Sequence, residues 1–376
     1  MKLIERGIKM LKRFEVTNFK GFKDKLVFDL TSKEYKFNSA IIKEGIVNKA
    51  IVYGKNGTGK SSLGIALFDI TAHLTDNERI KNKYVKNYIN LASDKDFATF
   101  TFYFVFDGND VKYEYIKKDL NFLIKESLYI NGEEVISYDF FDKKDNFISK
   151  ELIGNLNVDL EDNKLSIIKY IYRNTPTGTA PVVSSLVEYV EGMLWYRSLS
   201  DGNQYCGFTN GSNILDEEIY RAGKLQEFEN FLKENGVEYK LTFVNVNGVN
   251  IIYVIFDNGK KAPLSEIAST GTSALFLYFC WSISFKEISL LFIDEFDAFF
   301  HFEAAENIVM QLNKAKNFQS ILTSHNTYLM QNRLTRPDCC YIITNGRITS
   351  LYDATDKDIR EGHNLEKMYI NGVFTE

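Results

Sequence analysis

The sequence predicts a mixed α/β fold, in which a parallel sheet with helices on its faces is joined to an antiparallel β lobe and to a helical insert. Three observations lead to this prediction. An apolar strand at 50–53 passes through a glycine-rich turn into a helical pattern, strands and helices alternate after residue 289, and two strongly alternating segments break at Asp-Gly or Asn-Gly. A chain of 376 residues can bury a sizeable core.

The N-terminal part is expected to be rich in strands. Residues 12–30 show short alternating patterns that predict two strands. A helix is expected to begin at Ser61, after the glycine-rich turn. Residues 98–117 alternate strongly around Asp107-Gly108, which predicts a hairpin because Asp-Gly favours the tight turns that join antiparallel strands.

The middle of the chain predicts helices at 182–198 and 215–234, with a polar loop near 174–185. Because no heptad pattern is sustained, a long coiled-coil arm is not expected. We therefore expect three parts, which are an N-terminal part of the main domain at 1–139, an inserted helical lid at 140–236, and a C-terminal part of the main domain at 237–376.

The C-terminal part alternates strands with helices. A second hairpin with an Asn-Gly turn is expected at 240–257. Residues 289–293 and 320–322 predict two buried strands, separated by a helix that ends near Ala315. This alternation favours a parallel sheet with helices on its faces.

Composition and charge indicate an ordinary globular protein. Lys and Arg number 45 against 50 Asp and Glu, so the net charge of −5 argues against attraction of the whole surface to nucleic acid, although a local basic stripe is compatible with it. The uncharged stretch at 267–285 contains several Ser and Thr residues, so a buried helix is expected rather than a membrane span. The scattered cysteines and histidines predict reduced thiols, no zinc site and a cytoplasmic location.

The glycine-rich segment matches G-x-x-x-x-G-K-[ST] and predicts a loop that binds the phosphates of ATP. Its glycines let backbone N–H groups approach the phosphates, and the following helix directs its positive end at them. Lys60 would supply a charge to the terminal phosphates, and the Ser61 hydroxyl would ligate Mg²⁺. The predicted ATP-binding residues are Gly54, Lys55, Asn56, Gly57, Thr58, Gly59, Lys60, Ser61 and Ser62.

A second apolar strand, 290–293, is followed directly by two acidic residues, Asp294 and Glu295. Asp294 is suited to bind Mg²⁺ from the side opposite Ser61. Glu295 is suited to act as the base that orients and deprotonates an attacking water. A solvated acidic strand end is the alternative. Such a strand after a phosphate loop favours the functional interpretation.

Two further segments add candidate phosphate contacts. Ser269, Gly271 and Thr272 lie at the expected start of a helix, where backbone N–H groups could bind a terminal phosphate. Ordinary helix capping by Ser269 is the alternative. His325 follows the strand that includes 321–323, and a neutral imidazole there could contact the γ-phosphate or hold the attacking water.

The series GKNGTGKSS, ASTGT, LLFIDE and LTSH resembles the ABC ATPase superfamily in order and spacing over nearly the whole chain except the middle insert. The start FEVTNFKGFKD looks like the SMC, RecF and OLD branch. The stretches DEFDAFFH and REGHNLEKMY look most like bacterial OLD-type and AbiL-type anti-phage ATPases, including AriA-like and retron- or Septu-associated ATPases.

The resemblance implies an ABC ATPase head that works as a dimer or larger homo-oligomer, with ATP and Mg²⁺ as cofactors. It implies that Glu295 is the catalytic base, that His325 is the switch histidine, and that Ser269 and Gly271 contact the nucleotide of the partner chain. Asp297 would lie in the loop that crosses the dimer interface. The glutamine that couples the two lobes in the family is not identifiable, and the insert has no recognisable zinc hook.

Several functions compete. The leading hypothesis is a regulatory ATPase in anti-phage defence that controls a separate toxic effector, often a nuclease. The alternative is an SMC-like or RecF-like ATPase that clamps double-stranded DNA, for which a basic stripe would be needed. A self-contained nuclease, a transporter subunit and a membrane partner are not expected. The candidate basic residues are Lys2, Arg6, Lys9, Lys12, Arg13, Lys81, Lys83 and Lys86.

Overall fold

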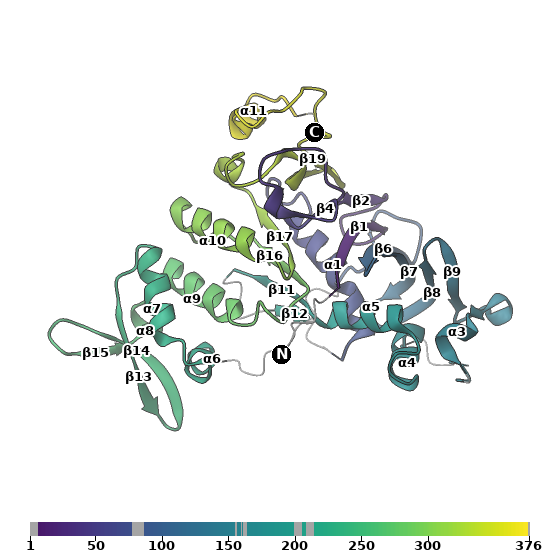
Figure 1. Ribbon diagram of the computed structural model, residues 1–376, viewed down its shortest axis with the longest axis horizontal. Helices are drawn as coiled ribbons and strands as arrows, with labels where there is room; N and C mark the ends of the chain where they lie inside the picture. Colours follow the sequence, from purple (N-terminus) through teal and green to yellow (C-terminus); the bar gives the residue numbers. More distant parts are fainter. Residues whose placement is uncertain are drawn as a thin grey trace.

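Two seven-stranded sheets form the framework of the molecule, with helix α1 between them (Figure 1). The computed structural model describes residues 7–76, 86–154, 156–158, 160, 164–198, 205–207 and 214–374. The antiparallel sheet has the strand order β10-β9-β8-β7-β6-β1-β2. Its strands are β1 (Lys9–Thr17), β2 (Leu26–Asp29), β6 (Ala98–Phe106), β7 (Asn109–Asp119), β8 (Phe122–Ile130), β9 (Glu133–Asp139) and β10 (Phe147–Ile148).

The second sheet, called the core sheet below, has the order β12-β11-β16-β17-β5-β18-β19. Its five inner strands are parallel, and the two edge strands β12 and β19 pair antiparallel to their neighbours. The predicted parallel sheet is therefore confirmed. Its strands are β5 (Lys49–Tyr53), β11 (Met193–Arg197), β12 (Tyr205–Gly207), β16 (Leu290–Asp294), β17 (Gln319–Ser324), β18 (Cys340–Thr344) and β19 (Arg347–Ser350).

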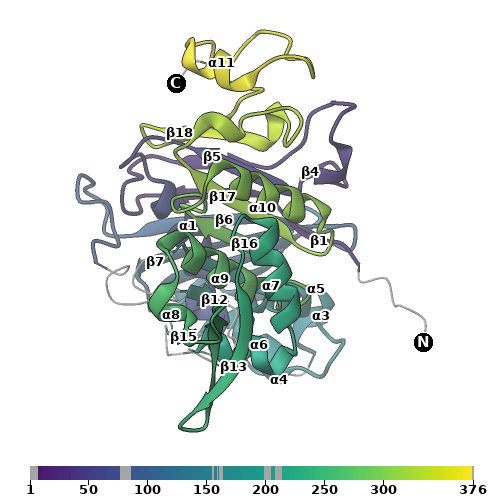
Figure 2. The same ribbon diagram turned by 90° about the vertical axis from the view of Figure 1, so that its left-hand side faces the viewer.

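Both faces of the core sheet are buried, which explains the apolar runs in its central strands β5, β11 and β16. In β16, Leu290 and Phe292 face the antiparallel sheet, while Leu291 and Ile293 face the opposite side. Between the two sheets lie α1 (Lys60–Leu74), α4 (Ile167–Asn174) and α5 (Pro181–Glu191). The other face is covered by α6 (Leu215–Ala222), α7 (Leu225–Glu234), α9 (Thr270–Ser282) and α10 (Phe302–Lys314) (Figure 2).

Gly64 allows α1 to lie directly against the core sheet. A Cβ atom at this position would be 2.7 Å from the Phe292 ring and 2.8 Å from Nε1 of Trp195. Any larger side chain would therefore displace the helix or the rings.

Both predicted hairpins are present. β6 pairs with β7 across Asp107-Gly108, and both turn residues have positive φ angles of 52° and 85°. The second hairpin joins β13 to β14 and extends away from the two large sheets (Figure 1). The remaining elements are β3 (Ile42–Lys43), β4 (Ile46–Val47), β13 (Lys240–Val246), β14 (Val249–Ile255), β15 (Lys261–Pro263), α3 (Lys150–Ile153), α8 (Leu264–Ile267) and α11 (Leu365–Ile370), with short 3₁₀ helices at Ser39–Ile41, Lys143–Asp145, Thr327–Leu329 and Pro337–Cys339.

The expected helical lid at 140–236 requires correction. The helix expected over 182–198 ends at Glu191, and 193–197 form β11, which pairs in parallel with β16. A strand buried on both faces lacks an alternating pattern and is hard to distinguish from a buried helix in the sequence. The segment 140–236 therefore contributes two strands, β11 and β12, to the core sheet and helices to both of its faces, which a separate lid would not do.

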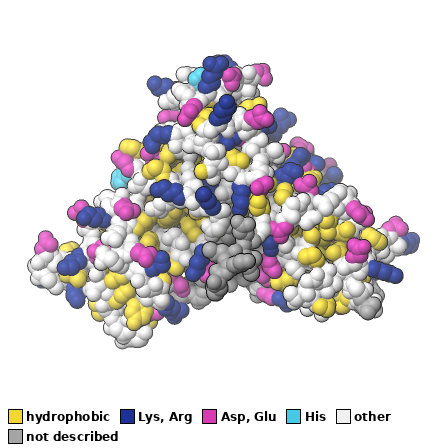
Figure 3. All heavy atoms as spheres, in the orientation of Figure 1, with side chains coloured by type: hydrophobic (Ala, Val, Ile, Leu, Met, Phe, Trp, Pro, Cys, Tyr) yellow, Lys and Arg dark blue, Asp and Glu magenta, His cyan; other side chains and the backbone are white. Residues whose placement is uncertain are grey.

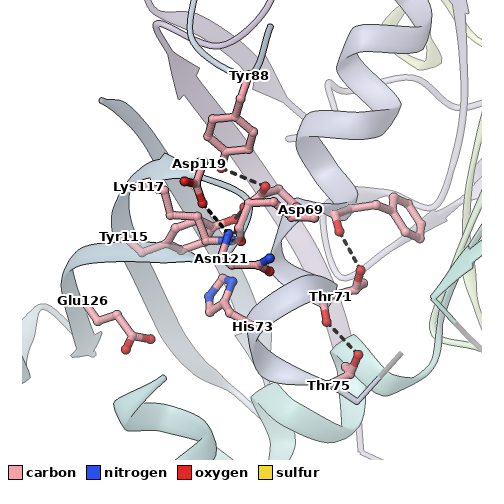
Figure 4. Close-up of polar contacts among 12 residues, drawn as sticks. Asp69, Thr71, His73, Thr75, Tyr88, Tyr115, Lys117, Asp119, Asn121 and Glu126 are labelled. Atoms are coloured by element: carbon pink, nitrogen blue, oxygen red, sulfur yellow. Dashed lines mark hydrogen bonds and ion pairs between the residues drawn. The ribbon is translucent and has the colours of Figure 1, made fainter. Parts of the chain in front are cut away.

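A buried polar cluster joins α1 to the antiparallel sheet (Figure 4). Asp69 of α1 accepts hydrogen bonds from Tyr88 at 2.8 Å, from Tyr115 at 3.1 Å and from Lys117 at 2.7 Å. The side chains of Asp69 and Lys117 are fully shielded from solvent. Because a buried charge without its partner is strongly destabilising, this pair fixes α1 relative to β7.

Among the described residues, no helix combines the length and the apolar character that crossing a membrane requires. Residues 267–285, expected to form a buried helix, contain α9, whose side chains pack on the core sheet. Cys280, Cys339 and Cys340 are buried free thiols, as expected, while the side chain of Cys206 lies outside the described part.

Candidate functional site

The phosphate loop joins β5 to α1, as the sequence predicts, and its glycines are required by close contacts. A Cβ on Gly54 would lie 2.5 Å from Oγ1 of Thr58 and 2.8 Å from the carbonyl oxygen of Ile343. Gly59 has a φ angle of 108°, which is strained for any other residue. Residues 55–57 form the exposed tip of the loop, while Thr58, Gly59, Ser61 and Ser62 are partly buried.

Lys60 lies across the inside of the loop. Its Nζ atom donates hydrogen bonds to the carbonyl oxygens of Gly54 at 2.6 Å and Lys55 at 3.0 Å. Burial lowers the pKa of Lys60, and the nearby carboxylates of Glu295, Asp294 and Asp297 oppose this shift. The amino group is therefore held by the backbone of the loop, and its charge is favoured by carboxylates from a distant part of the sequence.

Ser61 and Asp294 meet at the end of the core sheet. Oγ of Ser61 donates a hydrogen bond to Oδ2 of Asp294 at 2.6 Å. Asp294 is fully buried, and burial raises the pKa of its carboxyl group, while hydrogen bonds from Ser61 and Thr323 oppose that shift. The structure therefore brings together the two residues that the sequence predicts for one Mg²⁺ site.

This donor set fits Mg²⁺. Magnesium is usually held by one or two carboxylates together with waters and substrate phosphates. The hydroxyl of Ser61 and the carboxylate of Asp294 provide two adjacent oxygen atoms beside the phosphate loop. Within the described ranges, no group of three or more His, Cys, Asp or Glu residues could hold a metal by itself, so the remaining ligands would have to come from nucleotide and water.

Thr323 links the two acidic residues, and no motif in the sequence indicates this role. Its Oγ1 atom donates to Oδ1 of Asp294 at 2.7 Å and accepts the backbone N–H of Glu295 at 2.8 Å. Glu295 has a φ angle of 52°, so the chain turns sharply directly after β16. This turn explains how two consecutive acidic residues can serve one site.

Arg197 is the second residue that the sequence did not reveal. Its Nη2 and Nε atoms lie 2.6 and 3.2 Å from Oε2 of Glu295, and Nε lies 3.7 Å from Oδ2 of Asp294. Arg197 ends β11, the strand beside β16 in the core sheet. The only signal in the sequence is an arginine at the end of an apolar run whose pattern predicts a helix.

Ser269 is the N-cap of α9, so within its own chain it has the ordinary capping role that was the alternative to phosphate binding. Its Oγ accepts the backbone N–H of Thr272 at 3.2 Å. Ser269, Gly271 and Thr272 line a pocket of about 580 Å³ together with residues of α7, α10 and the loop after β16. None of residues 54–62 lines this pocket. The structure therefore places Ser269, Gly271 and Thr272, which are called the signature below, away from the phosphate loop of their own chain.

Asp297 and His325 lie in adjacent segments after β16 and β17. The side chain of Asp297 is 1% exposed, and its Oδ2 accepts hydrogen bonds from Ser324 at 2.7 Å and Asn326 at 2.9 Å. That the loop containing Asp297 crosses a dimer interface stays a prediction. Phe299 of this loop is exposed, whereas Oδ2 of Asp297 is bonded within the chain. His325 is exposed at the sheet edge where the phosphate loop begins.

Three of the four described members of the candidate basic stripe are paired with carboxylates. Lys9 lies 2.8 Å from Glu188, Lys12 lies 3.1 Å from Asp110, and Arg13 pairs with Glu15. Basic and acidic side chains are interspersed over the face drawn in Figure 3. Lys86 lies in the described part, whereas Lys2, Arg6, Lys81 and Lys83 lie outside it.

Comparisons with solved structures return distant likenesses. The SMC head domain from Thermotoga maritima is 15% identical, with a TM-score of 0.44 and coverage of 90% of this chain and 98% of that one. A complex of the SMC head with the C-terminal winged-helix domain of ScpA is 16% identical, with a TM-score of 0.46 and coverage of 90% and 97%. RecF-ATP, the recombination mediator of the RecFOR pathway, is 14% identical, with a TM-score of 0.40 and coverage of 91% and 99%.

No curated protein matches the sequence. A family model described as "AAA domain, putative AbiEii toxin, Type IV TA system" matches residues 49–331. The match begins with β5, contains the phosphate loop and the Asp294–Glu295 pair, and extends beyond His325. The chain therefore belongs to this family of AAA domains.

Proposed function

We propose that this protein binds ATP together with Mg²⁺ and hydrolyses it to ADP and phosphate. The observation that carries the proposal is the 2.6 Å hydrogen bond between Ser61 and Asp294, which brings the end of the phosphate loop to the end of β16. Lys60, Ser61, Asp294 and Glu295 thereby form one site at a single edge of the core sheet. In open parallel sheets, ligands bind outside the carboxyl ends of the strands.

Each residue has a defined part in this proposal. The loop amides and the N-terminus of α1 bind the phosphates, and Lys60 places its charge among them. Ser61 and Asp294 hold Mg²⁺, which neutralises charge on the phosphate oxygens when bound. Glu295 accepts a proton from the attacking water, and His325 holds that water or contacts the γ-phosphate.

We propose further that the complete site needs two chains. The pocket that Ser269, Gly271 and Thr272 line contains no residue of the phosphate loop, so these residues would reach a nucleotide held by a second copy. The start of α9 offers the N–H groups and the dipole that favour a phosphate. Hydrolysis would then loosen the dimer, so that ATP acts as a switch.

The biological role that we propose is a regulatory ATPase subunit in anti-phage defence, which controls a separate toxic effector. The family description, which names a toxin of a type IV toxin–antitoxin system, is consistent with this class of role. The DNA-clamp alternative requires unpaired basic side chains, and Lys9, Lys12 and Arg13 are each engaged by a carboxylate.

The first experiment measures ATP binding and turnover by the purified protein. We expect Lys60→Ala to lose both, because the charge at the centre of the loop is removed. Lys357→Ala is the matched control, since Lys357 is an exposed lysine remote from the loop in sequence, and it should behave as wild type. A folded wild-type protein without affinity for ATP would refute the proposal.

The two-chain site is tested by mixing variants. Lys60→Ala removes the phosphate loop, and Ser269→Arg blocks the exposed signature position. Each variant alone should be inactive, whereas a mixed dimer retains one intact site and should regain turnover. If the mixture stays inactive although the chains exchange, the signature does not act across chains.

The defence role is tested in cells that carry the gene with its neighbours. Lys60→Ala should abolish phage resistance, while Lys357→Ala should retain it. Intact resistance in the Lys60→Ala strain would contradict the role. A salt-dependent shift of duplex DNA by the purified protein would favour the clamp instead.

A further inference from the structure

The contact between Arg197 and Glu295 is created by the topology of the core sheet. β11 and β16 run in parallel, and their register pairs Arg197 with Asp294. Both strands end at the edge where the phosphate loop lies, because β5 runs in the same direction two strands away from β16. The buried strand β11 therefore positions the guanidinium group of Arg197 beside Asp294 and Glu295.

The geometry of this contact is asymmetric. Both Nη2 and Nε of Arg197 approach the same carboxylate oxygen, Oε2, at 2.6 and 3.2 Å. Within the described ranges, no hydrogen bond engages Oε1 of Glu295. One oxygen is thus held by two charged donors, and the other is left to accept a proton.

We propose that Arg197 is a positioning residue for Glu295, the base of the proposed ATPase reaction. The guanidinium fixes the rotation of the carboxylate so that its second oxygen faces the attacking water. This inference rests on the proposed function, and it adds a residue that neither the phosphate loop nor the acidic strand motif contains.

The surroundings of the pair favour this role over a purely structural one. The chain already has a structural pair of this kind in Arg336 and Asp338, whose side chains are 3% and 1% exposed. By contrast, the side chains of Arg197 and Glu295 are each 31% exposed. Ion pairs that water can reach contribute little to stability, so the contact between Arg197 and Glu295 adds little to the stability of the fold.

The experiment compares single-turnover and steady-state ATP hydrolysis by wild type, Arg197→Ala and Arg197→Lys. Arg197→Ala should lower kcat at least about tenfold with little change in KM, because a base misplaced by about 1 Å can cost about a hundredfold. Arg197→Lys should recover part of the loss, since it keeps the charge but not the two-donor geometry. Arg360→Ala, which removes another exposed ion pair, is the control and should not change kcat.

A double-mutant cycle with Glu295→Gln separates positioning from structure. Once the base is absent, removing Arg197 should cause no further loss of kcat. Losses that multiply in the double variant, or a wild-type rate in Arg197→Ala, would overturn the inference while leaving the proposed ATPase function intact. Absence of hydrolysis by the wild type would instead refute the proposed function, and this inference with it.

Discussion

Oγ of Ser61 donates a hydrogen bond of 2.6 Å to Oδ2 of Asp294, although the two residues are 233 positions apart in the chain. Ser61 lies in the first turn of α1, and Asp294 ends β16. The contact spans the core sheet edge and unites two motifs that are separate in the sequence. The following predictions depend on this arrangement.

Asp294→Asn should separate activity from stability. The amide keeps the shape of the side chain but loses its charge, so the apparent Mg²⁺ affinity in ATP turnover should fall at least about tenfold. Because burial raises the pKa of Asp294, its ionised form is costly in the folded protein, and the thermal midpoint should not decrease. Magnesium titrations and thermal melts test both parts, with Asp358→Asn at an exposed site as the control. A large drop in the midpoint would contradict this interpretation.

Glu295→Gln should retain ATP binding while hydrolysis slows at least about a hundredfold, as expected when a general base is lost. Equilibrium binding of a fluorescent ATP analogue and single-turnover hydrolysis measure the two quantities separately. Normal turnover in this variant would show that another group is the base.

The buried Lys49 should make the stability of the protein depend on pH, and replacing this residue should remove its contribution. Burial lowers the pKa of Lys49 to about 7, so the unfolded chain binds a proton that the folded chain lacks between this value and the ordinary one near 10.5. The free energy of unfolding should therefore rise with pH across this window, by about 1 kcal/mol per pH unit. Urea unfolding between pH 7 and 9 should show a rise in wild type that is smaller in Lys49→Met. Equal pH dependence in both proteins would contradict the prediction.

The buried cluster around Asp69 should be sensitive to which partner is removed. Asp69→Ala leaves the Lys117 charge buried without its carboxylate and should cost about 3–5 kcal/mol of unfolding free energy. Lys117→Met should cost less, because Tyr88 and Tyr115 continue to donate to Asp69. Asp358→Ala, at an exposed pair, should change stability by no more than about 0.5 kcal/mol. Urea titrations of the three variants would contradict this ranking if Lys117→Met were the most destabilised.

The parts of the site that the sequence predicted are those encoded by contiguous residues. Gly54 to Ser61 form a local motif whose conformation depends on glycine, and the strand ending at Asp294 follows from its apolar run. Arg197 and Thr323 could not be assigned in this way. Their contacts depend on which strands are neighbours, and β11 and β17 flank β16 although they are distant from one another in the sequence.

The misassigned helix at 193–197 has the same physical origin. Leu194 and Tyr196 pack on one face of the core sheet, while Met193 and Trp195 pack on the other, so no polar residue marks a solvent side. The burial of Asp297 was also not predictable from the sequence. An acidic residue in a loop suggests exposure, yet hydrogen bonds from Ser324 and Asn326 make its burial tolerable.

The position of Asp69 on α1 has a mechanical consequence. It lies about two turns beyond Ser61 on the same rigid helix, and its carboxylate is bound to β7 in a place that water does not reach. If α1 moves during the proposed ATP hydrolysis, β7 has to move with it, because separation would break this shielded ion pair. The antiparallel sheet would therefore move together with the phosphate loop as one rigid unit. The position of its outer surface would then depend on which nucleotide is bound.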